Sequence, residues 1–196
     1  FPLNDAFDPL AWLGAQQCYP QFYWQQRNGD EELAALGAVI TFSSLALATQ
    51  FLREQNAAGD TRICGLNAFN PEQGSLFLPR LFWRRTAGTA TLRLQLWSDY
   101  SLQEDAHAAR DFLQQLQPAR PIRPLAVQVE HENHQPQRAE WLRLVRRATE
   151  TIARGDFEKV VLARATDLEF TQRINPVALM AASRALNLHC YHFCMV

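Results

Sequence analysis

The chain has 196 residues, of which 47% are hydrophobic and 20% are charged, and its formal net charge is -1. A chain of this length and composition can bury one sizeable core or two small ones. The near-zero charge and the lack of a basic tract give no electrostatic reason to expect nucleic acid or an anionic membrane as a partner.

The opening of the chain bears on its compartment. Residues 1–5 lack the basic start and the long apolar centre of a secretory signal, and no uninterrupted apolar run reaches about 18 residues. We therefore expect a cytoplasmic protein.

The cysteines are few and scattered, so we expect reduced thiols rather than a disulfide framework. Near the end of the chain, strand alternation would place Cys190, His192 and Cys194 on one face. Neighbours on one face of a strand lie about 7 Å apart, which is too far for three of them to share a tetrahedral zinc ion. Buried thiols are the expected state, and no metal site is predicted here.

The first quarter of the chain predicts a helix, a hairpin and a second helix. Asp8-Pro9 is an N-cap followed by proline at the first helical position, which predicts a short helix. The aromatic run 21–26, the turn residues Asn28-Gly29 and the apolar run 33–40 predict two strands joined by a tight turn. An apolar stripe with helical spacing predicts a helix over 44–55.

The next segment reads as strands. Three are predicted, over 62–68, 76–85 and 91–97, with Ala87-Gly88 connecting the last two. In the last of them Leu92, Leu94 and Leu96 alternate with mostly polar residues. This pattern predicts a strand whose leucine face lies on the core.

A third helix and a boundary follow. Ser101 with Glu104 three residues later predicts a capping box for a helix that runs to about Gln117. Three prolines then interrupt helix, and the polar run 131–138 predicts a connecting segment rather than a packed element. We expect an amino-terminal α+β subdomain over 1–117, a connecting segment over 118–135 and the start of a second domain over 136–196.

That second part predicts helix, strand, helix and strand in turn. Trp141, Leu144, Val145, Ala148 and Ile152 follow the spacing of one helix face, and the arginines between them are expected on its solvated side. Gly155 ends this helix. A strand is predicted over 159–170, a helix over 175–186 and a final strand from 189.

Lys159 is the candidate functional residue of this region. Alternation along the predicted strand puts Lys159, Val161 and Ala163 on one face, where small side chains leave room for a ligand or for a packed helix. Spacing alone favours the simpler interpretation, in which Lys159 is the first, solvent-reaching residue of the strand.

A family resemblance changes this assessment. The run from Ile152 to Arg164, with Gly155-Asp156 and Lys159-Val160-Val161-Leu162-Ala163-Arg164, resembles the segment that opens the chorismate-binding domain of isochorismate synthases, anthranilate synthases and their relatives. From 22–30 through 65–69 to 191–193, the chain is similar to the amino-terminal part of menaquinone-specific isochorismate synthases.

The resemblance implies an α+β fold with antiparallel β-sheets layered with helices, a truncated form of the chorismate-utilising (anthranilate synthase component I-like) fold. Residues 136–196 would be the incomplete start of the chorismate-binding catalytic domain. The small-molecule substrate would be chorismate, and the product isochorismate for menaquinone biosynthesis. Oligomeric state is left open.

The resemblance also implies a role for Lys159. Relatives that add ammonia carry glutamine at this position, whereas those that add water carry lysine as general base. Lys159 would deprotonate a water that attacks C2 of chorismate while the C4 hydroxyl leaves. The general acid and the glutamates that bind Mg²⁺ would lie beyond Val196, so no metal ligand is assigned within the chain, and the 196 residues alone are expected to be inactive.

Two alternatives stay open. A siderophore-pathway isochorismate or salicylate synthase could share the chemistry of Lys159. The residues up to about 130 could instead form a non-catalytic ligand-binding domain, because the corresponding region of tryptophan-pathway relatives holds a feedback inhibitor. No comparable serine-containing inhibitor motif occurs in the chain.

Overall fold

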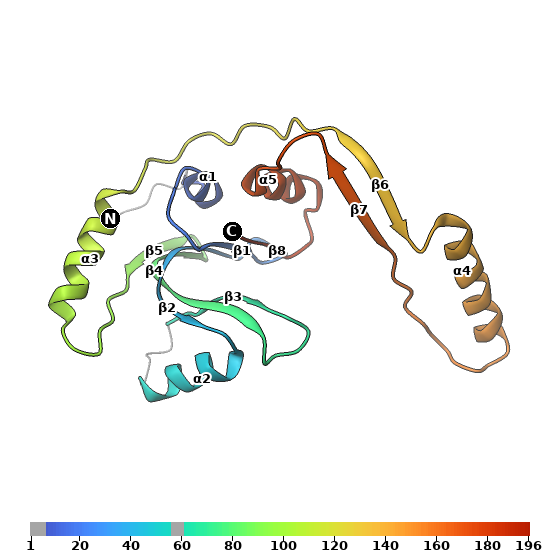
Figure 1. Cartoon of the computed structure of the whole chain (residues 1–196), viewed down its shortest axis with the longest axis horizontal. Coiled ribbons are helices and arrows are strands. Elements are labelled where there is room, and N and C mark those ends of the chain that lie inside the picture. Colours follow the sequence, from blue (N-terminus) through green and yellow to red (C-terminus); the bar gives the residue numbers. More distant parts are fainter. Residues whose placement is uncertain (1–6, 56–60) are drawn as a thin grey trace. The chain divides into compact units, whose positions relative to one another are not determined.

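The computed structural model describes residues 7–55 and 61–196, so residues 1–5, on which the absence of a secretory signal was argued, lie outside the described part. In chain order the elements are α1 (Pro9–Gly14), β1 (Gln21–Gln25), β2 (Glu31–Phe42), α2 (Leu45–Glu54), β3 (Cys64–Asn67), β4 (Gly74–Thr86), β5 (Thr89–Leu94), α3 (Leu102–Gln114), β6 (Val129–Gln135), α4 (Arg138–Ala153), β7 (Ala165–Phe170), α5 (Pro176–Leu186) and β8 (His192–Met195) (Figure 1). Helices and antiparallel strands therefore mix as the α+β prediction requires. None of the described helices is both long and apolar enough to cross a membrane.

The packing divides the chain into two compact units, Phe1–Pro124 with Asn175–Val196, and Leu125–Ile174. The last helix and strand thus pack with the amino-terminal unit. The predicted division into 1–117, 118–135 and 136–196 concerns the domains of the complete fold and stays a prediction.

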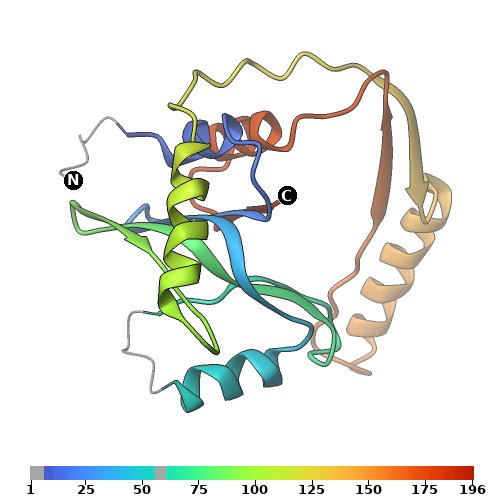
Figure 2. The same ribbon diagram turned by 60° about the vertical axis from the view of Figure 1, so that its left-hand side comes forward.

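The first unit is built on one antiparallel sheet in the order β3-β4-β2-β1-β8, with β5 also pairing with β4 (Figures 1 and 2). The long strand β4 pairs along its length with β2, while β3 pairs with its first residues and β5 with its last. β8 comes from the end of the chain and pairs with β1, so the sheet joins segments that are far apart in sequence.

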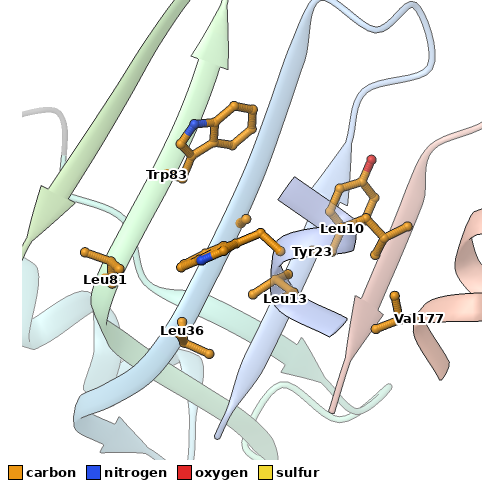
Figure 3. Packing of buried hydrophobic residues seen from close by; sticks show 9 residues of the cluster. Leu10, Leu13, Tyr23, Leu36, Leu81, Trp83 and Val177 are labelled. Atoms are coloured by element: carbon orange, nitrogen blue, oxygen red, sulfur yellow. The ribbon is translucent and has the colours of Figure 1, made fainter. Parts of the chain in front are cut away.

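A hydrophobic core lies between this sheet and the helices α1 and α5 (Figure 3). Its buried members are Leu10, Trp12, Leu13, Tyr23, Ala34, Leu36, Leu81, Trp83 and Val177. Burial of these large apolar side chains is the main source of stability for the unit.

The predicted starts of α1 and α5 are confirmed by their caps. The carboxylate of Asp8 accepts hydrogen bonds from the backbone N–H groups of Leu10 (3.0 Å) and Ala11 (3.3 Å). Asn175 caps α5 in the same way. These bonds satisfy donors that have no partner within the first turn of a helix.

The predicted capping box of α3 is wrong, although the helix itself is confirmed. Ser101 occupies the N-cap position without a side-chain hydrogen bond to the helix. Asp105 is the acidic residue in use, because its carboxylate pairs with Arg80 at 2.6 and 2.7 Å and accepts a hydrogen bond from the backbone N–H of Trp97 at 2.7 Å. Asp105 therefore forms an ion pair with Arg80 of β4, and the predicted capping hydrogen bond of Ser101 does not form.

The predicted core-facing side of the fifth strand is confirmed, although its leucines are only partly covered. Leu92 and Leu94 are paired with Trp83 and Leu81 of the core, so they do lie on the core side of the sheet. They are nevertheless 44% and 41% exposed, and Leu96 is 40% exposed. The reason is that β5 pairs only with β4 and lies at the edge of the described sheet.

The second unit consists of the two-stranded ribbon β6–β7 and the helix α4. The expectation that 131–138 is only a connecting segment is wrong, since Val129–Gln135 pairs with Ala165–Phe170. The strand escaped prediction because it is polar on both faces and both faces are exposed. No residue of Leu125–Ile174 is fully buried.

Candidate active site

Lys159 lies in an irregular segment between α4 and β7, not in a strand. The strand predicted over 159–170 begins only at Ala165. Its pairing partner β6 ends at Gln135, and among the described residues no other strand lies along 159–164. The predicted alternation of Lys159 with Val161 and Ala163 therefore does not apply to this structure.

The side chain of Lys159 is exposed and makes no hydrogen bond or ion pair within the described part of the chain. Its neighbours are also in solvent, and Val161 is 82% exposed. From 152 to 169 only Leu162 and Arg164 are half-buried. A lysine must be neutral to accept a proton, and burial is one way to favour the neutral form. The described residues do not supply that burial.

A further signal in the sequence singles out Lys159. Lys159 is the only lysine of the chain, and the other 18 of its 19 lysine and arginine residues are arginine. Arginine stays protonated in proteins, whereas lysine can lose its proton. Lys159 is therefore the one cationic side chain among these that can serve as a base.

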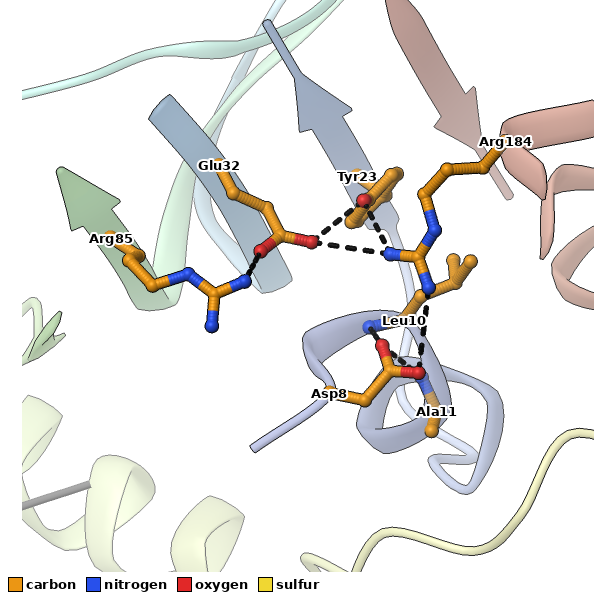
Figure 4. Close-up of polar contacts among 7 residues, drawn as sticks. All are labelled: Asp8, Leu10, Ala11, Tyr23, Glu32, Arg85 and Arg184. Carbon is orange, nitrogen blue, oxygen red and sulfur yellow. Dashed lines mark hydrogen bonds and ion pairs between the residues drawn. The ribbon is translucent and has the colours of Figure 1, made fainter. Parts of the chain in front are cut away.

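A polar cluster in the first unit was not found from the sequence. The hydroxyl of Tyr23 donates to Glu32 Oε1 at 2.7 Å, and Arg184 donates to the Tyr23 oxygen at 2.8 Å and to Glu32 at 3.3 Å (Figure 4). Arg85 binds the other oxygen of Glu32, and Arg184 also pairs with Asp8 at 3.6 Å. The cluster joins α5 to the sheet and to the cap of α1.

The electrostatics of this cluster follow from burial. Burial raises the pKa of Tyr23 above its ordinary value, and the adjacent Glu32 carboxylate adds to the effect. Burial disfavours charge on Arg184, but Tyr23, Asp8 and Glu32 outweigh it and raise the pKa of the guanidinium. Each member thus has a partner, and the arrangement stabilises the fold rather than presenting a reactive group. Its members come from elements far apart in the chain, so no local sequence motif predicts the cluster.

The expectation of buried thiols is wrong for Cys190, which is exposed, whereas Cys64 is buried and Cys18 and Cys194 are half-buried. All four are free. Burial raises the pKa of Cys64 to about 12 and also raises the pKa of Cys194. Cys190 precedes β8, and His192 has its Nε2 3.0 Å from the carbonyl oxygen of Asn187, so the predicted alternation does not begin at Cys190.

The donor set for Mg²⁺ can be tested on the described residues. Within 7–55 and 61–196, no group of three or more His, Cys, Asp or Glu side chains is placed to hold a metal ion. The residues present do not fit a magnesium site, and we assign no step of the chemistry to one.

Comparison with known proteins places this geometry in context. The family model for chorismate binding enzymes matches residues 3–196. The chain is 56% identical over 195 residues to the isochorismate synthase MenF of Escherichia coli strain K12, covering 100% of this chain and 45% of that protein. It is 31% identical over 188 residues to the isochorismate synthase MenF of Pasteurella multocida, covering 95% of this chain and 42% of that protein.

A solved structure agrees with these matches. The structure of MenF, the menaquinone-specific isochorismate synthase from Escherichia coli, superposes with a TM-score of 0.88 at 56% identity, covering 100% of this chain and 46% of that one. The fold of the chain is thus a truncated form of the chorismate-binding fold. The chain spans about half the length of the relatives that it matches.

Proposed function

Because the chain belongs to the chorismate binding enzymes, we propose that the complete protein is an isochorismate synthase that converts chorismate to isochorismate. The observation that supports this most is the 56% identity to an isochorismate synthase over the whole chain, together with lysine at position 159. Lysine is the residue that the resemblance associates with the addition of water rather than ammonia.

Lys159 is the proposed general base. Its neutral amine takes a proton from water, the water oxygen bonds to C2 of chorismate, the ring double bonds shift, and the bond between C4 and its hydroxyl oxygen breaks. The leaving hydroxyl takes a proton from an acid group expected after residue 196. One water enters and one leaves, so the product is an isomer of the substrate. General acid–base assistance of this kind contributes about 10²- to 10⁴-fold to a rate.

Three further parts of the proposal concern the setting of the reaction. Mg²⁺ is proposed for the complete protein, with carboxylate ligands outside the described residues. Menaquinone biosynthesis is the proposed pathway, and it is supported by the similarity to a relative described as menaquinone-specific. The cytoplasm is the proposed compartment.

The test is product analysis. The purified complete protein is incubated with chorismate and Mg²⁺, and the products are separated by chromatography. Isochorismate as the accumulating product supports the proposal, whereas salicylate with pyruvate would support the siderophore-pathway alternative. Absence of turnover, or tight tryptophan binding in calorimetry without turnover, would favour a ligand-binding domain. The 196-residue polypeptide serves as a second sample and is expected to be inactive.

A further inference from the structure

We propose that Arg164 is a positioning residue for Lys159, and that it acts through a hydrogen bond to the backbone carbonyl of Pro136. This inference rests on the proposed role of Lys159 as general base. Three observations support it. They are the end of the β6–β7 ladder, the partial burial of Arg164, and the hydrogen bonds at the two ends of the segment around Lys159.

The ladder ends at a proline. Gln135 and Ala165 are the last paired residues of the ribbon, so the next pair would be Pro136 with Arg164. Proline has no backbone N–H and cannot extend the ladder. The side chain of Arg164 supplies a donor there, since its Nε donates to the Pro136 carbonyl oxygen at 3.1 Å. A side-chain bond thus continues the connection where a backbone bond cannot.

Burial separates Arg164 from the other arginine near this segment. Arg164 is half-buried, whereas Arg154 pairs with Asp156 at 3.2 Å while both side chains are more than half exposed. An exposed pair of that kind adds little stability. Among the described residues, neither Arg164 nor Lys159 forms an ion pair with an acidic side chain. The guanidinium of Arg164 is therefore used to hold backbone rather than to balance charge.

A hydrogen bond lies at each end of the segment that carries Lys159. At one end Gly155 closes α4 with φ of +80°, and its N–H donates to the Ile152 carbonyl at 3.0 Å. At the other end Arg164 holds the Pro136 carbonyl. Lys159 lies four residues after Gly155 and five before Arg164. The Arg164 bond therefore determines where the segment leaves the ribbon.

The position of a general base matters to the rate. A misplacement of about 1 Å in a catalytic group can cost about 100-fold. In the complete protein, a general base must be held where its neutral form is favoured, and an amine that is displaced from such a position into water becomes neutral only at higher pH. Loss of the Arg164 anchor should thus lower kcat and move the acidic limb of the pH profile of kcat/KM to higher pH.

The experiment compares three variants of the complete protein. Arg164→Met keeps the length of the side chain without a donor, Arg164→Lys keeps a donor and the charge, and Arg154→Met is the matched control. We expect Arg164→Met to lower kcat about 10- to 100-fold with KM changed less than about threefold, and to shift the acidic limb to higher pH. Arg164→Lys should lie between this variant and the parent, and Arg154→Met should match the parent.

A kcat of Arg164→Met equal to that of Arg154→Met would overturn the inference, and so would a lower kcat with an unmoved pH profile, which indicates a merely structural role. If Arg164→Met fails to fold in a thermal melt, the pH profile of Arg164→Lys decides by the same criterion. Lys159→Ala separates this inference from the proposed function. Full activity of Lys159→Ala would refute the proposed base, whereas an inactive Lys159→Ala beside an unaffected Arg164→Met would refute only the positioning role.

Discussion

At the scale of single residues, Glu32 is the most deeply buried charged residue among those of the first unit that the structure describes. Its side chain is 2% exposed and is bound by Tyr23, Arg85 and Arg184. Removing one partner from a buried ionic cluster leaves charge without compensation, which costs about 3 to 5 kcal/mol. We expect Glu32→Ala to lower the free energy of unfolding by about 3 kcal/mol in urea titrations followed by tryptophan fluorescence.

The neighbouring carboxylate provides the control. Glu31 pairs with Arg84 at 2.7 Å, and both side chains are more than a quarter exposed. A pair with that access to water contributes at most about 1 kcal/mol, so Glu31→Ala should have a small effect. Equal losses for Glu31→Ala and Glu32→Ala would contradict the account of the buried cluster.

Asp105 gives a prediction in pH. The hydrogen bonds from Arg80, assisted by the backbone N–H of Trp97, lower the pKa of Asp105. A lowered pKa in the folded state means that the unfolded chain binds more protons at acid pH, so this contribution is complete above about pH 4 and is lost as the pH falls through the folded pKa. Asp105→Asn should flatten the acid part of the curve of unfolding free energy against pH.

The control for this prediction is Asp111→Asn. Asp111 Oδ1 lies 3.5 Å from Nη2 of Arg110, and the two side chains are 61% and 69% exposed. That variant should keep the acid slope of the parent. An unchanged slope in Asp105→Asn would show that the Arg80 pair does not control acid stability.

Residue-level prediction succeeded where the signal was local. The caps at Asp8 and Asn175 could be read from adjacent residues because the donors that they satisfy lie two and three positions away. The Glu32 cluster could not be predicted, since its partner Arg184 lies 152 residues along the chain. The assignment of Lys159 as a base stays a prediction.

At the scale of elements, substitution of two glycines allows the cost of backbone strain to be compared with the cost of a steric clash. Gly65 and Gly88 both have positive φ, at +147° and +78°. A Cβ at Gly65 would lie 2.1 Å from the backbone oxygen of Ser75 in the paired strand, whereas nothing lies within 4 Å of a Cβ at Gly88. We expect Gly88→Ala to cost about 1 kcal/mol, from conformation alone.

Gly65→Ala should cost more, about 3 kcal/mol, because the edge strand β3 must move away from β4. Thermal melts of both variants under the same conditions measure the difference. A Gly65→Ala melting temperature as high as that of Gly88→Ala would mean that the pairing of β3 with β4 is looser than the structure shows.

A strand could be predicted only where its burial is reflected in a pattern of apolar residues in the sequence. Strands of the central sheet alternate or carry apolar runs and were found, as was the Ala87-Gly88 connection, now a two-residue turn between β4 and β5. β6 has no apolar face and was missed. The run 159–164 has strand-forming residues and was assigned to a strand, but a strand also needs a neighbour, which a single sequence does not display.

At the scale of the whole molecule, the two units differ in their cores. The first unit holds the core described above and a second buried cluster, formed by Phe22, Ala35, Cys64, Phe77 and Phe82, whereas no residue of Leu125–Ile174 is fully buried. A region with few buried contacts opens at low free energy. In the 196-residue polypeptide we expect limited proteolysis to cut first within 125–174, and the amides of α4 to exchange before those of β2 and β4.

Mass spectrometry of early fragments and of deuterium uptake checks both expectations. Slow exchange throughout α4 would contradict them, because it would require stabilising contacts that the described residues do not show. The fold class could be predicted from the resemblance and is confirmed by the solved relative. The division of the described chain into two units could not, since it depends on which apolar side chains find partners.

The proposed role of Lys159 is that of general base when the complete protein isomerises chorismate. It is tested most directly by the turnover of chorismate by the complete protein and its Lys159→Ala variant over a range of pH. The account predicts that the parent forms isochorismate and that Lys159→Ala lowers kcat about 10²- to 10⁴-fold with a folded state unchanged by circular dichroism. A variant that forms isochorismate at the parent's rate, with the parent's pH profile, would contradict it.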